Sequence, residues 1–298
     1  MISVAEARAR IVAALTPLPN ETIDVMDTLG RVLAVDAIAR ISHPVADMSA
    51  MDGYAVRAAD AVAGARLRVT GKAAAGHPWS GAVGPGEAAR IFTGAHVPAG
   101  ADAIVIQEDT AAAGEFVTIN ETAIGGRHIR PAAQDFRDGE TVLTAPRRLS
   151  YRDVGLLAAM NLPLVHVTRR PRVAILSTGD EVVMPGDPIG PGQLVSANGP
   201  GLCAFVRHHG GEPVHLGIAS DDAASLQALA ESATNADMIV TSGGVSVGDH
   251  DLIGSVLGRA GLDVGFHKIA MRPGKPLMFG RFKSTPFMGL PGNPVSAM

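Results

Sequence analysis

From residue 172 onward, short apolar runs alternate with segments in which apolar residues recur at helical spacing. The runs predict strands at 173–177, 214–218, 238–240, 264–269, 277–280 and 286–290, and the periodic segments predict helices at 195–209, 223–236 and 252–260. Strands that alternate with helices are typical of a mainly parallel sheet covered on both faces. The pattern therefore predicts a three-layer α/β domain over residues 169–298.

Residues 41–139 follow a different pattern, because Gly and Pro recur every few residues between short strand candidates. These candidates lie at 66–70, 88–92, 103–107 and 116–119. Short strands separated by frequent turn residues predict a small β-rich domain.

Two capped amphipathic helices flank this β-rich region. Ser3 with Glu6, and Ser150 with Asp153, have the spacing of a capping box at a helix start. We expect the two helices to pair in space. Residues 1–40 and 140–168 would then form a connecting helical and β domain, with the β-rich domain inserted into it.

Composition narrows the class of protein. The chain has 298 residues, of which 47% are hydrophobic and 18% charged, as in globular proteins. The net charge of −4 favours neither nucleic acid nor an anionic membrane. No apolar run approaches the roughly 20 residues that span a bilayer, and the N-terminus does not resemble a signal peptide. The single cysteine, Cys203, is expected to be a packed thiol, and a reducing cytoplasm fits best.

Polar motifs follow the predicted strands of the α/β domain. They lie at 178–181, 220–222, 241–251, 271–276 and 291–294. Open α/β sheets bind ligands at the carboxyl ends of their strands. We therefore expect these five motifs to gather at one edge of the sheet.

The glycine-rich segment 241–251 is the most informative of the five motifs. A strand, a glycine-rich turn and a helix start form an anion cradle, because free backbone N–H groups point at the ligand. Asp249 and Asp251, however, add negative charge where an anion would bind. A divalent cation that bridges carboxylates and phosphate removes this conflict. The segment therefore predicts a site that binds a phosphate group and a metal ion and that carries out a reaction.

Local explanations exist for each of these motifs. The acidic pair at 180–181 fits a solvated turn, and Asp221 or Asp222 fits an N-cap of the helix at 223. Asn293 fits simple turn chemistry. Lys268, Arg272 and Lys275 fit surface charges, although the prolines around Lys275 indicate a stiff loop.

The β-rich region and the remaining histidines give weaker signals. Residues 47–56 fit a turn that leads into a strand, and residues 92–95 and 130–135 also fit local structure. No Cys/His set has zinc spacing, and neither a full Walker sequence nor a Gly-x-Ser-x-Gly elbow occurs.

Taken together and in this order, these segments resemble the molybdopterin molybdenumtransferase family, which includes bacterial MoeA and the gephyrin E domain. The segments that carry the resemblance are 47–56, 91–95, 177–181, 241–251, 272–276 and 289–294. The resemblance implies an L-shaped homodimer with connecting, inserted β-rich and α/β domains, the last related to molybdopterin adenylyltransferases. Relatives continue into a C-terminal β domain, which we expect this chain, ending at Met298, to lack together with its contribution to the molybdate pocket.

The resemblance also implies a reaction and its site. Molybdate is inserted into adenylylated molybdopterin, and AMP is released with the help of Mg²⁺. The residues implied in catalysis are Glu181, Asp221, Asp249, Asp251, Lys275, Asp52 and Asp135, of which Glu181, Asp249 and Asp251 would bind the metal. Those implied in binding substrate are Gly243, Gly244, Ser246, Thr93, Arg130, Lys268, Arg272, Pro276, Asn293 and Ser296. In this family the β-rich residues come from the partner subunit, so the site is shared.

The implied roles agree with the charges involved. Molybdate and a phosphoanhydride repel each other, and cations offset that repulsion. The substrate supplies the thiolates, so no cysteine is needed at the site. Two other functions stay open. The α/β domain could adenylylate molybdopterin or hydrolyse a nucleotide pyrophosphate, or the chain could be a non-catalytic scaffold. A molybdopterin adenylyltransferase is a possible partner protein.

Overall fold

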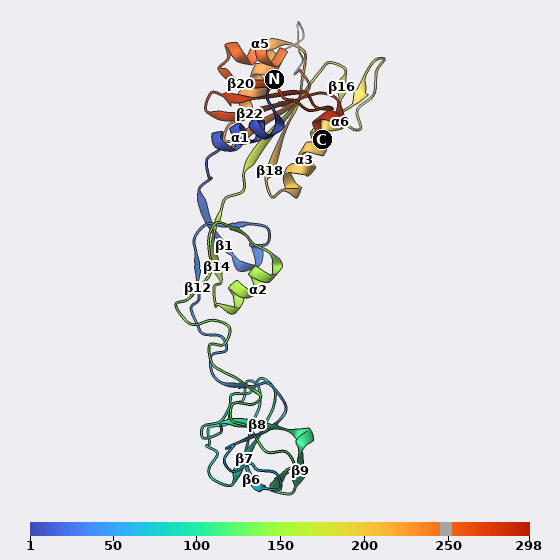
Figure 1. Cartoon of the computed structure of the whole chain (residues 1–298). Coiled ribbons are helices and arrows are strands. Elements are labelled where there is room, and N and C mark those ends of the chain that lie inside the picture. Colours follow the sequence, from blue (N-terminus) through green and yellow to red (C-terminus); the bar gives the residue numbers. More distant parts are fainter. Residues whose placement is uncertain (245–251) are drawn as a thin grey trace. The chain divides into compact units, whose positions relative to one another are not determined.

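A six-stranded sheet forms the centre of the C-terminal part of the chain. The computed structural model describes residues 1–244 and 252–298. Residues 1–21 and 168–298 form one unit, the α/β unit, and residues 22–167 form a second, the β-rich unit (Figure 1). The strands of the central sheet are β15 (Arg172–Thr178), β18 (Glu212–Ala219), β19 (Met238–Ser242), β20 (Leu262–Lys268), β21 (Pro276–Phe282) and β22 (Thr285–Leu290). The helices of this unit are α1 (Val4–Ala14), α3 (Asn198–His208), α4 (Ala223–Ser232), α5 (Leu252–Arg259) and α6 (Pro294–Ala297).

The order of strands in this sheet is β18-β15-β19-β22-β21-β20. The first four are parallel to one another, while β21 is antiparallel to both β22 and β20. The prediction of a mainly parallel sheet is therefore confirmed. Since β20 is antiparallel to β21, it runs in the same direction as β22. The carboxyl ends of five strands consequently lie at one edge.

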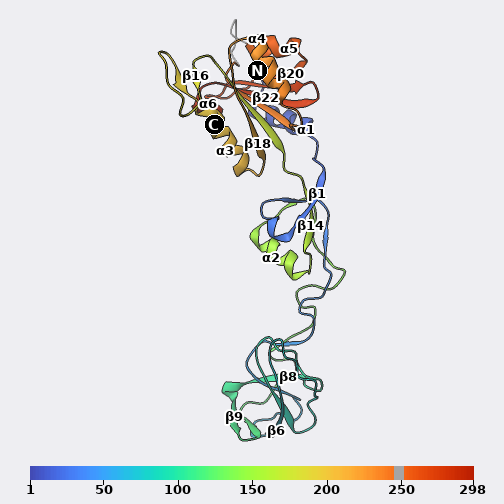
Figure 2. The ribbon, with the colours of Figure 1, turned by 180° about the vertical axis from the view of Figure 1, so that it is seen from behind.

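Helices cover both faces of the sheet, as the pattern predicts (Figures 1 and 2). On one face, Leu202 and Cys203 of α3 pack against Ile175 and neighbouring side chains. On the other face, Leu226 of α4 and Leu257 of α5 form the largest apolar cluster of the unit. Burial raises the pKa of the Cys203 thiol, which is a packed side chain as expected.

The first helix does not pair with the helix at 151–159, so that prediction is wrong. Ala7 of α1 packs against Phe266 and Phe279 of the α/β sheet, and residues 1–21 belong to this unit. The backbone of Ile2 also bonds to Lys268 and Ala270. The hydrophobic stripe of α1 was visible in the sequence, but nothing in it specified which apolar surface would cover the stripe. The other proposed domain boundaries stay predictions.

A second small difference concerns the start of α3. The helix was predicted from residue 195 but begins at Asn198. Leu194–Val195 instead form β17, which pairs with β16 (Val182–Val183) in a two-stranded sheet. The chain between Thr178 and Asn198 therefore makes a long excursion from the sheet edge.

An ion pair ties the entry of β15 to the entry of β19. Nη1 and Nη2 of Arg169 each donate to the carboxylate of Asp237 at 2.8 Å, and the Arg172 backbone N–H donates to it at 2.7 Å. These bonds lower the pKa of Asp237, with the Arg169 bond as the largest cause. The pair thus fixes two neighbouring parallel strands at the end opposite their carboxyl ends.

We expect Asp237→Asn to destabilise the protein by about 1.5–3 kcal/mol at pH 7, because a charge-assisted network is lost. Because the pKa of Asp237 is lower in the folded chain than in the unfolded chain, its carboxylate stabilises the fold at pH values above the unfolded-state pKa. This stabilisation is lost as the pH falls through the folded-state pKa. The difference between wild type and variant should therefore shrink between pH 7 and pH 2, as measured by urea unfolding. The matched control is Glu231→Gln, which removes the exposed pair with Lys283 and should cost less than about 1 kcal/mol. Equal effects of the two variants would contradict this expectation.

The β-rich unit contains a mixed sheet of six strands in the order β8-β5-β7-β6-β10-β9. Its strands are β5 (Gly53–Val56), β6 (Arg66–Ala73), β7 (Glu87–Ile91), β8 (Ala103–Ile106), β9 (Thr110–Ala113) and β10 (Phe116–Ile119). Alternate residues of β5 enter two separate cores, with Tyr54 and Val56 on one face and Ala55 on the other. All four strands predicted for this region are present.

The remainder of the unit is built around α2 (Tyr151–Ala159). The capping box of Ser150 and Asp153 is complete, as predicted. Leu157 of α2 packs against Leu33 and Val165. The associated strands are β1 (Asn20–Asp24), β2 (Val32–Leu33), β13 (Arg147–Arg148) and β14 (Leu164–Thr168), with the two-stranded sheets β3 (Ala37–Ile38) with β12 (Thr141–Leu143) and β4 (Met48–Ser49) with β11 (Ile129–Arg130). Short 3-10 turns at Val25–Asp27 and Gln107–Asp109 complete the unit. In the described part of the chain, no helix has the length and apolar character needed to cross a membrane.

Candidate active site

The carboxyl edge of the α/β sheet carries the predicted polar motifs. The loops after β15, β18, β19, β20 and β22 leave the sheet at this edge, because these five strands run in the same direction. Strand β21 begins there, with Pro276 directly opposite Lys268 of β20. The topology therefore gathers the loops of the sequence motifs along one edge of one sheet.

Hydrogen bonds connect neighbouring loops at this edge. The backbone N–H of Asp221 donates to Oδ1 of Asp180 at 3.0 Å, which joins the loops after β18 and β15. The N–H of Gly243 donates to the carbonyl of Leu290 at 3.1 Å, which joins β19 to β22. These bonds make the edge a continuous surface rather than a set of separate turns.

Gly243 and Gly244 lie at the centre of the edge, where β19 ends. Their φ angles are +91° and +63°, values that side-chain-bearing residues rarely adopt. A Cβ at Gly243 would lie 2.7 Å from the carbonyl oxygen of Thr178, and one at Gly244 would lie 2.9 Å from the Thr178 hydroxyl. The close approach of two loops thus requires glycine at both positions.

The acidic side of the edge is formed by Asp180, Glu181 and Asp221. The side chains of Glu181 and Asp221 are exposed, and the neighbouring Asp222 caps α4 by accepting from the Ser225 N–H at 2.8 Å. One member of the Asp221–Asp222 pair is therefore an N-cap, as the local explanation expected. Ser246, Asp249 and Asp251 lie outside the described residues.

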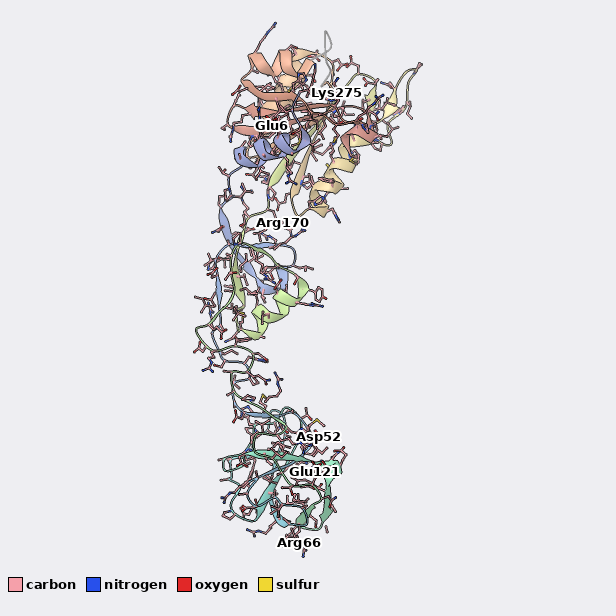
Figure 3. The ribbon with its side chains drawn as sticks, in the orientation of Figure 1. Glu6, Asp52, Arg66, Glu121, Arg170 and Lys275 are labelled. Atoms are coloured by element: carbon pink, nitrogen blue, oxygen red, sulfur yellow. The ribbon has the colours of Figure 1, made fainter. Side chains whose placement is uncertain are left out.

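The basic side of the edge comes from the end of β20 and the loop that follows. Arg272 and Lys275 are exposed, Lys268 is half-buried, and none of the three forms an ion pair with a residue in the described ranges. Figure 3 labels Lys275 among the side chains of the α/β unit. The backbone of Lys275 is fixed by a bond from the Ile269 N–H to its carbonyl at 3.1 Å. Among the described residues, the edge therefore offers three cations without carboxylate partners, two of them on a braced loop.

Asn293 and Ser296 belong to the short helix α6 after β22. The Asn293 side chain caps this helix by accepting from the Val295 N–H at 3.0 Å, which is the turn chemistry that its sequence also suggested. The carbonyl of Ser296 lies 3.5 Å from the position of a Cβ at Gly274. Helix α6 is thereby adjacent to the basic loop.

Sequence reasoning missed a buried polar group below the edge. The side-chain amide of Asn198, at the start of α3, donates to Oγ of Ser242 at 2.6 Å and to the carbonyl of Gly292 at 2.8 Å. Asn198 thus fixes the ends of β19 and β22 beneath the glycines. The Asn-Gly-Pro sequence at 198–200 was the available signal, because these residues are common at helix starts.

In the β-rich unit, Asp52 and Thr93 form a direct pair. Oδ1 of Asp52 accepts from both the backbone N–H and the hydroxyl of Thr93, each at 2.8 Å. These bonds lower the pKa of Asp52, and the nearby charge of Arg90 lowers it further. The carboxylate is therefore held ionised and oriented.

We expect Thr93→Val to raise the pKa of Asp52 toward its ordinary value, because the variant removes the hydroxyl donor and keeps the backbone donor. NMR titration of the carboxyl carbon measures the change. Thr110→Val is the matched control, since the Thr110 hydroxyl donates to the Gln107 carbonyl and to no carboxylate. An unchanged pKa in Thr93→Val would contradict the expectation.

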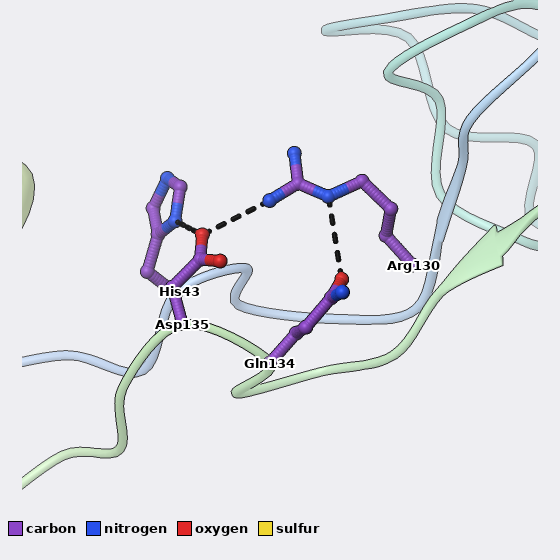
Figure 4. A network of polar contacts seen from close by, with 4 residues as sticks. All are labelled: His43, Arg130, Gln134 and Asp135. Carbon is purple, nitrogen blue, oxygen red and sulfur yellow. Dashed lines mark hydrogen bonds and ion pairs between the residues drawn. The ribbon is translucent and has the colours of Figure 1, made fainter.

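Arg130 and Asp135 form the second predicted pair of this unit (Figure 4). Nη2 of Arg130 donates to Oδ2 of Asp135 at 2.9 Å, and Nδ1 of His43 lies 2.8 Å from the same oxygen. The His43 bond is the largest cause of the lowered pKa of Asp135, and the Arg130 charge adds to it. Gln134 accepts a longer bond from Arg130 Nε at 3.4 Å. His43 is a residue that sequence reasoning did not single out.

Both pairs lie beside the short strand β4. Arg130 stands opposite Met48 in the ladder of β11 and β4, and the Gly94 N–H donates to the Ser49 carbonyl at 2.9 Å. Residues far apart in the sequence are therefore gathered within the β-rich unit, as the α/β motifs are gathered within theirs.

The residues at the carboxyl edge of the α/β sheet and the two pairs beside β4 share a chemical character. Each combines oriented carboxylates with cationic side chains, and neither contains a described thiol or a nucleophilic serine with a base. Among residues 1–244 and 252–298, no group of three or more His, Cys, Asp or Glu side chains could hold a metal ion. The sets are suited to binding and polarising an anionic substrate rather than attacking it.

Two family models match the chain. The MoeA N-terminal region (domain I and II) matches residues 2–161, and the probable molybdopterin binding domain matches residues 174–298. The molybdopterin molybdenumtransferase of Nostoc sp. is 40% identical over 288 residues, which are 94% of this chain and 66% of that protein. The enzyme of the same name from Haemophilus influenzae is 37% identical over 302 residues, which are 100% of this chain and 74% of that protein.

A solved structure has the same fold. The molybdopterin biosynthesis MoeA protein from Pyrococcus horikoshii superimposes with a TM-score of 0.84 at 36% identity, covering 100% of this chain and 76% of that one. The similarity confirms the α/β plus β fold of molybdopterin-binding type. The chain spans about two thirds to three quarters of the length of these proteins.

Proposed function

Since the chain belongs to the MoeA family of molybdopterin molybdenumtransferases, we propose that it inserts molybdate into adenylylated molybdopterin and releases AMP. The observation that carries the proposal is the gathering of acidic and basic loops at the carboxyl edge of one sheet. Molybdate and the phosphates of the substrate are all anionic, so a site for both must supply cations and order the remaining charges.

We assign the roles at the edge from charge and position. Lys268, Arg272 and Lys275 bind the phosphate groups or molybdate, because they are cations without described carboxylate partners. Gly243 and Gly244 let the backbone approach the substrate closely. The turns at Pro276, Asn293 and Ser296 shape the oxyanion pocket.

Mg²⁺ fits the acidic side, where carboxylate oxygens are the ligands this ion prefers. Glu181 would hold it together with Asp249 and Asp251, and Asp221 would order its surroundings. When bound, the ion would neutralise charge on the phosphate that leaves with AMP.

The proposal extends to a homodimer. Asp52, Thr93, Arg130 and Asp135 would complete the site of the other subunit, since their charges complement those at the sheet edge. An adenylyltransferase that makes the substrate is the expected partner protein, and the cytoplasm is the expected compartment.

The experiment is an AMP-release assay of the purified chain with adenylylated molybdopterin, molybdate and Mg²⁺. The proposed function requires AMP release that depends on molybdate. Release without molybdate would favour a pyrophosphatase, and ATP consumption with molybdopterin would favour an adenylyltransferase. Tight binding of the substrate with no turnover would favour a scaffold.

A further inference from the structure

Two cations on the β-rich unit lie over one aromatic ring. Strands β5, β7 and β6 are neighbours, and their register places Tyr54 opposite Arg90 and Arg90 opposite Lys72. The Arg90 guanidinium carbon lies 4.7 Å from the centroid of the Phe92 ring, and Nζ of Lys72 lies 5.3 Å from it. Directly opposed residues share one face of a sheet. Both charges therefore lie on one face, beside one ring.

Arg90 is held in place while much of its hydrogen-bonding capacity is unused. Nη1 donates to the Gly53 carbonyl at 2.8 Å, and Nη2 donates to Oε1 of Gln107 at 2.7 Å. The guanidinium also stacks over the Tyr54 ring at 5.1 Å. Neither acceptor carries a charge, and a guanidinium has more donors than these two bonds use. The side chain is thus ordered in advance for an anion.

Lys72 is exposed and has no described hydrogen-bond or ion-pair partner within residues 1–244 and 252–298. Arg68 and Arg57 are in contrast neutralised, since Arg68 pairs with Glu87 at 2.7 Å and Arg57 with Asp60 at 3.6 Å. Like charges directly opposite each other destabilise a sheet. A bound anion would remove that cost at Lys72 and Arg90.

Asp52, a carboxylate that feels the Arg90 charge, is already occupied. Asp52 accepts two bonds from Thr93, the residue that follows Phe92. It therefore leaves the donors of Arg90 and Lys72 to another group. Phe92, the ring over which both cations lie, also directly precedes Thr93, which is a predicted substrate-binding residue.

We infer that Lys72 and Arg90 form a phosphate-binding site that holds a phosphate or diphosphate group beside Asp52 and Thr93. Arginine offers phosphate a planar fork and lysine a compact charge, so together they suit this ligand. The identity of the natural ligand as a phosphate of adenylylated molybdopterin rests on the proposed function. The binding site itself rests on the contacts of the two cations.

The test is a titration of the full chain with pyrophosphate, AMP and adenosine. The signal is the NMR chemical shift of the Phe92 ring, over which Lys72 and Arg90 both lie, so it reports on this site. Pyrophosphate and AMP should change the signal and adenosine should not. Lys72→Gln should weaken binding by about tenfold, and Lys72→Arg should largely restore it.

The matched control is Arg66→Gln, because Arg66 also lies over an aromatic ring of this sheet, 4.1 Å from the Phe116 centroid. It should bind pyrophosphate as the wild type does. Unchanged binding in Lys72→Gln, or equal weakening in Arg66→Gln, would overturn the inference. The proposed function is judged separately by AMP release. The inference can therefore fail while molybdate-dependent release persists, and it can hold in a chain that releases no AMP.

Discussion

Replacing Glu181 by Gln should lower molybdate-dependent AMP release by about 100-fold or more, because the variant removes a charge that orders the reacting groups and keeps the size of the side chain. The fold should be unaffected. The Glu181 side chain is exposed, and its backbone carbonyl accepts from the Leu194 N–H regardless of the side chain. The measurement is the AMP-release rate at saturating substrate, with circular dichroism to check the fold.

The matched control for this variant is Asp187→Asn. Asp187 is an exposed acid on the same excursion between Thr178 and Asn198. Its removal changes the net charge equally but leaves the acidic side of the edge intact. Normal turnover in Glu181→Gln would exclude Glu181 from the site, and an equal loss in Asp187→Asn would mean that only the overall charge matters.

A methyl group at Gly243 should destabilise the α/β unit by about 2–4 kcal/mol. The backbone there has a φ of +91°, which costs a side-chain-bearing residue about 1–2 kcal/mol. The added Cβ would also lie 2.7 Å from the Thr178 carbonyl, and overpacking costs about 1–3 kcal/mol more. Urea unfolding of Gly243→Ala measures the sum. AMP release should also fall, because the loops of β15 and β19 must move apart.

Gly258→Ala is the matched control for this second variant. Gly258 lies in α5 with nothing within 4 Å of the position of a Cβ. Alanine should stabilise this helix by about 0.5–1 kcal/mol. If Gly243→Ala were as stable as the wild type, the close approach of the two loops would not require glycine.

The arrangement of the α/β site could be predicted because it depends on local pattern. Strand and helix periods revealed the alternation, and alternation implies parallel strands whose carboxyl ends share an edge. The loop positions of Glu181 and Lys275 followed without knowledge of any distance. The Asp222 cap was visible for the same reason, since an N-cap depends only on the residues that follow it.

Contacts that depend on register or on distant surfaces could not be predicted. The bond from Thr93 to Asp52 spans 41 residues and depends on how β5 meets the chain after β7. The bond between His43 and Asp135 spans 92 residues. Likewise, α1 had an apolar stripe but no signal for Phe266 and Phe279 as its cover. A one-dimensional pattern specifies that a side chain is buried, whereas its partner is set by three-dimensional packing.

The position of α1 has a consequence for biosynthesis. Ala7 is translated long before Phe266 and Phe279, which cover it. The central strand β22 is made later still. Residues 22–167, in contrast, contain complete apolar cores of their own and are contiguous. Domains generally fold as units during synthesis. The middle of the nascent chain therefore folds first, and the α/β unit closes around its own N-terminal segment only when translation has passed residue 290.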